Sequence, residues 1–238
     1  MLPTSLAELR ERWDAGERFR FFLFYGHKPP ESGVDASCFS QWFSLAFDVE
    51  GTTYRTAEHW MMAEKARLFR DDEMLEQILA SETPRDAKAL GRKVSGFDPK
   101  TWDEHKFEIV RKGNHAKFSR HTELRDFLIS TKENVRGSKL SSATTGLPAS
   151  PGVMLAAEER ASYEVRSPES SVREQPEKYQ HAAATTGVIL VEAAGRDRIW
   201  GIGLGTKNPK SHDPMQWRGQ NLLGFALTQV REDLAAGE

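Results

Sequence analysis

The sequence predicts a mostly helical single domain with a few short strands. Amphipathic or well-capped segments follow one another from residue 56 to residue 130, which indicates consecutive helices. An aromatic segment at 20–25 and an apolar segment at 187–193 are short enough to be strands. A chain of 238 residues can bury a sizeable core as one domain.

Capping and turn residues set the expected boundaries. The helices are expected at 4–15, 56–69, 71–79, 83–91, 101–119, 121–130 and 216–234, and the strands at 20–25, 42–49, 52–55 and 187–193. Glu50-Gly51 is expected to form the tight turn between two of these strands. Residues 137–186 are rich in Ser, Thr, Ala, Glu and Pro, so we expect a flexible or loosely packed insertion there.

The helix expected after Thr56 carries a candidate site. Glu58, Met62 and Lys65 are spaced i, i+4 and i+7, so they share one face of this helix. The carboxylate and the amine could form an ion pair, or they could act as an acid/base pair in a cleft. Neighbouring aromatic and methionine residues argue against a fully solvated face.

Composition excludes several classes of protein. The 33 Lys and Arg residues nearly balance the 35 Asp and Glu residues, so the chain lacks the charge expected for non-specific binding to nucleic acid or membranes. No apolar run is long enough to span a bilayer, and we see no signal peptide. With one cysteine, Cys38, and scattered histidines, we expect a cytoplasmic protein without a zinc site, other metal or cofactor.

Several motifs together resemble the NADAR family, also called YbiA-like. They occur in the family's order from about Phe22 to Leu234, with residues 137–186 excepted. These motifs are TAEHWMMAEK at 56–65, AKALGR at 87–92 followed by Trp102, Lys117-Phe118 with Leu124, LVEA at 190–193, Asp197, WGIGL at 200–204 and WRGQNLLG at 217–224.

The resemblance implies one NADAR-like domain over residues 1–238, with an α+β fold that is mostly helical and has a small β-sheet. It also implies a hydrolase that cleaves an N-glycosidic bond. The implied substrates are phosphorylated ribosylamines of the riboflavin pathway or ADP-ribosylated guanine bases. For the guanine bases, the implied partner is the ADP-ribosylated nucleic acid that contains them. This chain departs from the family in having Ser40-Gln41-Trp42, where many members have Ser-Asn-Phe or Ser-Asn-Trp, and in its insertion.

Two carboxylates in the matched motifs are the acidic candidates. Cleavage of an N-glycoside develops positive charge at the anomeric carbon, which a nearby carboxylate stabilises while it activates water. We expect Glu58 to be this carboxylate, against the alternative of an ion pair with Lys65 or Arg92. Asp197 would position the water or bind ribose hydroxyls, or else would cap its turn. Lys65 would neutralise a charge, or would form a Schiff base with an opened sugar.

The remaining candidates would bind the substrate. Trp102 and Trp200 could stack on the leaving heterocycle. Phosphate groups could be held by Arg92 and by Arg218, which precedes the last expected helix. Asn221 could contact a base edge or ribose, or cap that helix, and Gly201 could let the backbone approach a ligand closely.

A different class of function remains open from the sequence. A non-catalytic module for ADP-ribose or NAD-like ligands would keep the same tryptophans and arginines but would make Glu58 structural. Turnover of a substrate, as opposed to binding alone, distinguishes the two classes.

Overall fold

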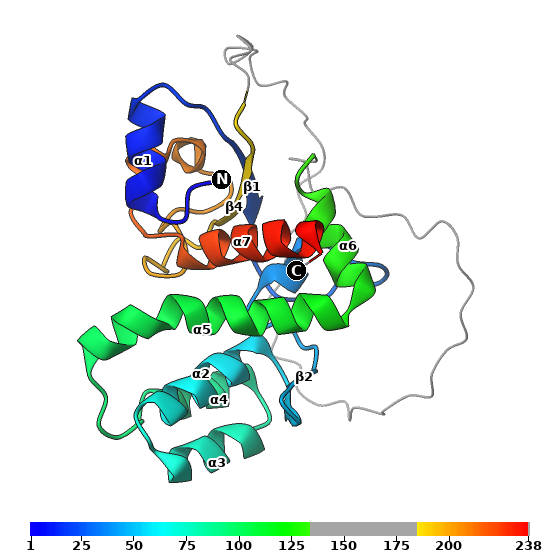
Figure 1. The fold of residues 1–238 in the computed structure, drawn as a ribbon, viewed down its shortest axis with the longest axis vertical. Helices are drawn as coiled ribbons and strands as arrows, with labels where there is room; N and C mark the ends of the chain where they lie inside the picture. The colour runs from blue at the N-terminus through cyan, green and yellow to red at the C-terminus, as the bar shows by residue number, and fades with distance from the viewer. Residues whose placement is uncertain (134–184, 238) are drawn as a thin grey trace, which may run out of the picture. The chain divides into compact units, whose positions relative to one another are not determined.

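A computed structural model of the chain describes residues 1–133 and 185–237 (Figure 1). Its fold is α+β and mostly helical, as predicted. The helices of the described residues are α1 (Leu6–Asp14), α2 (Ala57–Leu68), α3 (Asp72–Ala80), α4 (Pro84–Gly91), α5 (Pro99–Arg120), α6 (Thr122–Ser130) and α7 (Leu222–Ala236). The expected insertion lies outside the described residues, except for its last two positions.

Two small sheets accompany the helices. β1 (Arg20–Phe24) pairs in parallel with β4 (Val188–Glu192), so that Phe24 lies opposite Glu192 at the carboxyl end of the pair. β2 (Phe47–Val49) and β3 (Thr52–Tyr54) form an antiparallel hairpin. Its turn has positive φ at both Glu50 and Gly51, the conformation that matches the twist of a two-residue hairpin.

The expected strand at 42–49 is too long. Residues 36–39 form a 3-10 helix, and the N–H of Phe43 donates to the carbonyl of Ser40 in a turn. The next carbonyl, that of Gln41, accepts the N–H of Glu58 at 2.9 Å. Because these groups bond within the turn and to α2, the strand begins only at Phe47.

Most helices begin where their capping residues predict. The side chains of Thr56, Asp71 and Thr83 accept backbone N–H groups at the starts of α2, α3 and α4. α7 instead begins six residues later than expected. A 3-10 helix ends at Gln216, and the N–H groups of residues 218–221 donate to backbone carbonyls of the 198–202 segment instead of to a helix. Asn221 then adopts a left-handed conformation immediately before the helix.

The parallel strands separate two groups of buried side chains. Phe22, Phe24 and Leu190 belong to the larger group, which includes side chains of α2, α5 and α7, whereas Ile189 and Val191 belong to the smaller group with α1. Side chains alternate across a strand, so β4 supplies both groups. α5 packs against both α2 and α7 in the larger group (Figure 1). This packing fixes the position of α2, the helix that bears Glu58.

Candidate active site

The opposite faces of α2 border two different hollows. Glu58, Met61, Met62 and Lys65 line a cavity of about 120 Å³, together with Lys88, Gly91, Arg92, Trp102 and Trp200. Trp60, Glu64 and Arg67 line a larger hollow of about 680 Å³. The helical repeat of 3.6 residues separates these two sets of side chains by roughly half a turn.

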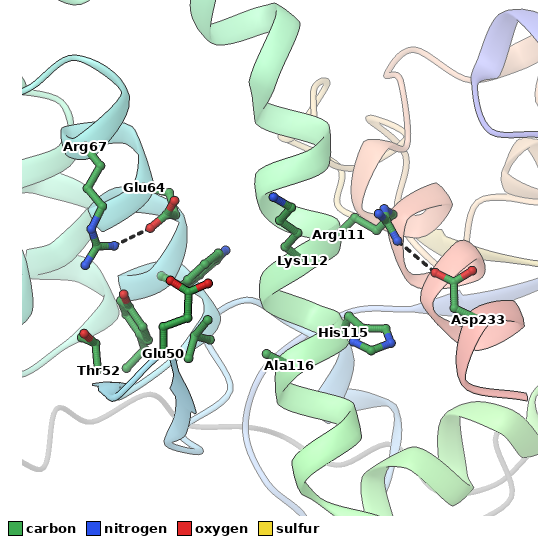
Figure 2. Close-up of a pocket in the computed structure, with 12 residues that line it drawn as sticks. Glu50, Thr52, Glu64, Arg67, Arg111, Lys112, His115, Ala116 and Asp233 are labelled. Carbon is green, nitrogen blue, oxygen red and sulfur yellow. Dashed lines mark hydrogen bonds and ion pairs between the residues drawn. The ribbon is translucent and has the colours of Figure 1, made fainter. Parts of the chain in front are cut away.

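Two ion pairs border the larger hollow. Figure 2 shows it between α2 with the β2–β3 hairpin on one side and α5 on the other. Arg67 pairs with Glu64, and Arg111 pairs with Asp233 at 3.0 Å. None of the side chains predicted from the sequence to form the site lines this hollow, so we place the candidate active site in the smaller cavity.

Glu58 occupies the wall of the smaller cavity and is 2% exposed. The cap at Thr56 and the bond from its own N–H to Gln41 fix its backbone. Its Oε1 has no hydrogen-bond partner among the described residues and lies 3.9 Å from Nζ of Lys88. Burial raises the pKa of Glu58 to about 7, and the negative charge of Asp197 adds to this rise. The positive charges of Lys88 and Arg92 and a hydrogen bond from Trp42 oppose it.

Lys65 lines the same cavity but is bonded elsewhere. Its Nζ donates to the carbonyl of Gly91 at 2.7 Å and lies 4.0 Å from the ring centroid of Phe97. Burial lowers the pKa of Lys65. The ion pair considered from the sequence, between Glu58 and either Lys65 or Arg92, is therefore replaced by the contact with Lys88.

The structure brings both expected indoles to this cavity. Trp102 lies in the first turn of α5, which begins after the cap at Asp98, and Trp200 follows β4 by eight residues. Both side chains are half-buried, and Arg92 at the end of α4 is exposed beside them. Flat aromatic faces next to a carboxylate suit a heterocycle attached to a sugar.

Asp197 shapes the turn that presents Trp200. Its Oδ1 accepts the N–H groups of Ile199 at 2.9 Å and Trp200 at 2.8 Å. Its negative charge also raises the pKa values of Glu58 and Glu192. The capping role considered from the sequence is present, and the carboxylate lies close enough to act on the charges of the site.

Three expected binding residues do not line the cavity. A Cβ on Gly201 would lie 2.8 Å from the carbonyl oxygen of Glu192, so Gly201 permits close backbone packing against β4, not against a ligand in this cavity. Asn221 is fully buried, and its amide bonds to the backbone of Leu190 and Glu192 at 3.0 and 2.9 Å. Arg218 is exposed outside the cavity.

Four residues at or near the site received no role from the sequence. Trp42 hydrogen-bonds to the side chain of Glu58, and its ring lies 5.7 Å from Nζ of Lys88. The ring of His27 lies 5.6 Å from that of Trp42. Lys88 and Glu192 both belong to the matched motifs. Glu192 could have been recognised as a candidate, because it is an acidic residue at the end of an otherwise apolar strand.

Glu192, a half-buried residue at the end of β4, has a second buried carboxyl oxygen near the site. Its Oε2 has no hydrogen-bond partner among the described residues. Burial raises its pKa to about 8, the charges of Asp197 and Glu58 raise it further, and Lys88 opposes them. Glu58 and Glu192 therefore share the same neighbouring cation and the same neighbouring acid.

No metal centre or membrane-spanning helix is found in the part of the chain that the structure describes. Within residues 1–133 and 185–237, no three His, Cys, Asp or Glu side chains are grouped so that they could hold a metal ion. No helix in these ranges is both long and apolar enough to cross a bilayer.

Comparison with known proteins assigns the family. The NADAR domain matches residues 23–138 and 173–235, and this chain belongs to the NADAR family. An N-glycosidase of Acanthamoeba polyphaga mimivirus is 30% identical over 222 residues, covering 91% of this chain and 98% of that protein. N-glycosidase YbiA of Escherichia coli (strain K12) is 35% identical over 97 residues, covering 41% of this chain and 59% of YbiA.

The fold has a counterpart among solved structures. The NMR structure of Escherichia coli YbiA matches with a TM-score of 0.56 and 24% sequence identity. The match covers 92% of this chain and 88% of YbiA. The α+β fold predicted from the sequence is thus confirmed as the fold of YbiA.

Proposed function

We propose that this N-glycosidase of the NADAR family hydrolyses a phosphorylated ribosyl or ADP-ribosyl compound. The proposed substrates are a riboflavin-pathway ribosylamine and an ADP-ribosylated guanine base. The observation that carries the proposal is the buried carboxyl of Glu58 in a cavity shared with two indoles. The names of the mimivirus and bacterial relatives support the same reaction class.

Glu58 would act on the sugar. A carboxylate removed from water interacts strongly with positive charge, because little solvent screens the interaction. Glu58 would stabilise the oxocarbenium-like carbon and take the proton of the attacking water, while Asp197 would position that water or a ribose hydroxyl. Since burial raises the pKa of Glu58 to about 7, ionised and protonated forms would both be present near neutral pH.

The indoles and the exposed cation would hold the two ends of the substrate. Trp102 and Trp200 would stack on the leaving base, and Arg92 would contact a phosphate at the mouth of the cavity. At about 120 Å³ the cavity is smaller than a typical ligand pocket, so it would enclose only the reacting part of the substrate.

A mutational test uses one isosteric change on each face of α2. Glu58→Gln should lower kcat by roughly 10²–10⁴-fold, because the neutral amide neither stabilises the charge nor accepts a proton. Glu64→Gln, in the larger hollow, should leave kcat near that of the wild type. The assay offers phosphorylated ribosylamines and ADP-ribosylated guanosine and detects the released base and sugar phosphate by mass spectrometry. Full activity in Glu58→Gln would remove Glu58 from the mechanism.

A covalent route through Lys65 is a separate proposal. Lys65 lies in the same cavity, and its lowered pKa favours the neutral amine that attacks an opened sugar. Borohydride added during turnover should then leave an adduct on the wild type that is absent from Lys65→Ala. If no adduct forms while product accumulates, Lys65 acts only through its charge or its packing.

A further inference from the structure

Two buried polar side chains of α5 hold the backbone segment that leads to Trp42. Asn114 and Lys117 are fully buried and three residues apart, so they lie on one face of the helix. Nδ2 of Asn114 donates to Oε1 of Gln41 at 2.8 Å. Nζ of Lys117 donates to the carbonyls of Cys38 and Ser40. α5 therefore anchors the stretch from Cys38 to Gln41, which we call the clamped segment, at two places.

The clamped segment in turn caps α2 at the candidate catalytic carboxyl. Glu58 is the second residue of α2, and the first N–H groups of an α-helix have no acceptor within the helix. The N–H of Glu58 donates instead to the carbonyl of Gln41 at 2.9 Å. The side chain of Thr56 accepts the next N–H, that of His59. Gln41 thus supplies the bond that fixes the backbone of Glu58 itself.

The side chain of Gln41 depends on Asn114. Gln41 is 6% exposed, and its Nε2 has no hydrogen-bond partner among the described residues. The 2.8 Å bond from Asn114 is therefore what satisfies this buried amide within the described parts of the chain. A buried amide that loses its partner is unfavourable, so without Asn114 the clamped segment would be drawn toward water.

Displacement of the clamped segment would be felt at the cavity. The next residue, Trp42, has its ring 5.7 Å from Nζ of Lys88, and that Nζ lies 3.9 Å from Oε1 of Glu58. A shift at Gln41 would therefore disturb the carboxyl through its own backbone and through the neighbouring cation.

We propose that Asn114 positions Glu58 for catalysis by holding Gln41, with Lys117 as the second anchor of the clamped segment. Asn114 does not line the cavity, so it is a positioning residue that acts through Gln41 and the N–H of Glu58. This inference rests on the proposed function, because it describes how the same carboxyl is held in place.

The kinetic test separates kcat from KM. Asn114→Leu should lower kcat by up to about 10²-fold and leave KM nearly unchanged, because a displaced catalytic group slows the chemical step while the binding surface remains. Thr228→Val is the matched control, since it removes an equally buried hydrogen-bonding group that joins α7 to β4. Both variants should lower Tm, but Thr228→Val should keep the wild-type kcat. Equal losses of kcat in the two variants, or none in Asn114→Leu, would overturn the inference.

A second readout needs no substrate. Amide hydrogen exchange measured by NMR should be roughly 5- to 10-fold faster at the N–H of Glu58 in Asn114→Leu than in the wild type, since about one hydrogen bond is weakened. Thr228→Val should leave this rate unchanged. If exchange rises but no tested compound is hydrolysed, the proposed substrates fail and the positioning of Glu58 by Asn114 stands. An unchanged rate in Asn114→Leu shows that Asn114 does not hold Glu58.

The double variant Gln41→Leu, Asn114→Leu tests whether Asn114 acts through Gln41. Both partners are then apolar and no buried amide lacks a partner, so the clamped segment should stay in place. Most of the kcat and the slow exchange at Glu58 should return, even if Asn114→Leu alone does not fold. A double variant that remains unfolded or inactive would show that Asn114 does not act through Gln41, and the inference would be wrong.

Discussion

At the residue scale, the charge of Glu58 depends on Lys88. The 3.9 Å contact from Nζ to Oε1 favours the ionised carboxylate, and 38% of the Lys88 side chain is exposed, so solvent screens part of the interaction. Glu58 lies on α2 and Lys88 on α4, so their spacing along the sequence does not reveal the contact. α4 thus supplies a cation to a carboxyl that burial alone would keep protonated.

Removal of this cation should move the pH dependence of activity. In Lys88→Met the pKa of Glu58 should rise, because the favourable charge is lost while the burial remains. The acid limb of kcat/KM should therefore shift to higher pH by about one unit or more. Lys112→Met, on the border of the larger hollow, serves as the matched control and should keep the wild-type limb. An unshifted limb in Lys88→Met would mean that Lys88 does not control the ionisation of Glu58.

Lys117 is a buried cation that does not line the candidate cavity. Lys117 stands in one of the matched motifs, and the structure buries it completely. Its Nζ donates to the carbonyls of Cys38 at 2.6 Å and Ser40 at 3.2 Å, and burial lowers its pKa to about 8. It holds the segment that leads to Trp42, so its contribution to the site is indirect.

At the element scale, close contact between α2 and α5 positions the site. A Cβ on Gly113 of α5 would lie 2.1 Å from Cδ1 of Trp60, whose Nε1 donates to the carbonyl of Ile109 at 2.7 Å. Trp60 lies on the face of α2 opposite Glu58 and is held by α5. The glycine therefore lets the two helices approach around a fixed indole.

Gly113→Ala should therefore destabilise the protein even though alanine favours helix. The added methyl overpacks a buried contact, which typically costs about 1–3 kcal/mol. Gly205→Ala is the control, because a Cβ there meets nothing within 4 Å. Thermal unfolding should give a lower Tm for Gly113→Ala and a nearly unchanged Tm for Gly205→Ala. An equal Tm for both variants would show that the α2–α5 contact relaxes without cost.

At the scale of the whole molecule, the buried acids should make stability depend on pH. The pKa values of Glu58 and Glu192 are raised on folding, from 4.5 to about 7 and about 8. Folded protein thus keeps protons that the unfolded chain releases, and this stabilisation is full below pH 4.5 and is lost as pH rises through the folded values. Carboxyls whose pKa values are lowered on folding, such as Asp71 and Asp98, change the stability only at pH values below this window.

The measurement compares the wild type with the double variant Glu58→Gln, Glu192→Gln at pH 5 and pH 8. The Tm of the wild type should fall relative to that of the double variant between these values, because only the wild type has to ionise the two buried acids. His59, whose pKa is lowered by burial, titrates in both proteins and cancels in the difference. A constant difference in Tm would show that these carboxyls are ionised at no cost in the folded state.

Local sequence determined the elements of this protein and the positions of several site residues. Caps such as Thr56 and Thr83 fixed helix starts, because a side-chain oxygen bonds N–H groups only two or three residues away. The spacing of Glu58 and Lys65 placed both on one face of α2, where the cavity lies, and matched motifs added Trp102 and Trp200. These relations involve neighbours along the chain or whole motifs, so they can be recognised from the sequence alone.

Tertiary structure alone decided which charges meet. It joined Lys88 to Glu58 across two helices and bound the amide of Asn221 to β4. It also brought Glu192, on a strand more than a hundred residues away, close enough for its charge to interact with theirs. Electrostatic and hydrogen-bond partners depend on distance in space and on the exclusion of water, and neither quantity is encoded in the spacing of residues along the chain.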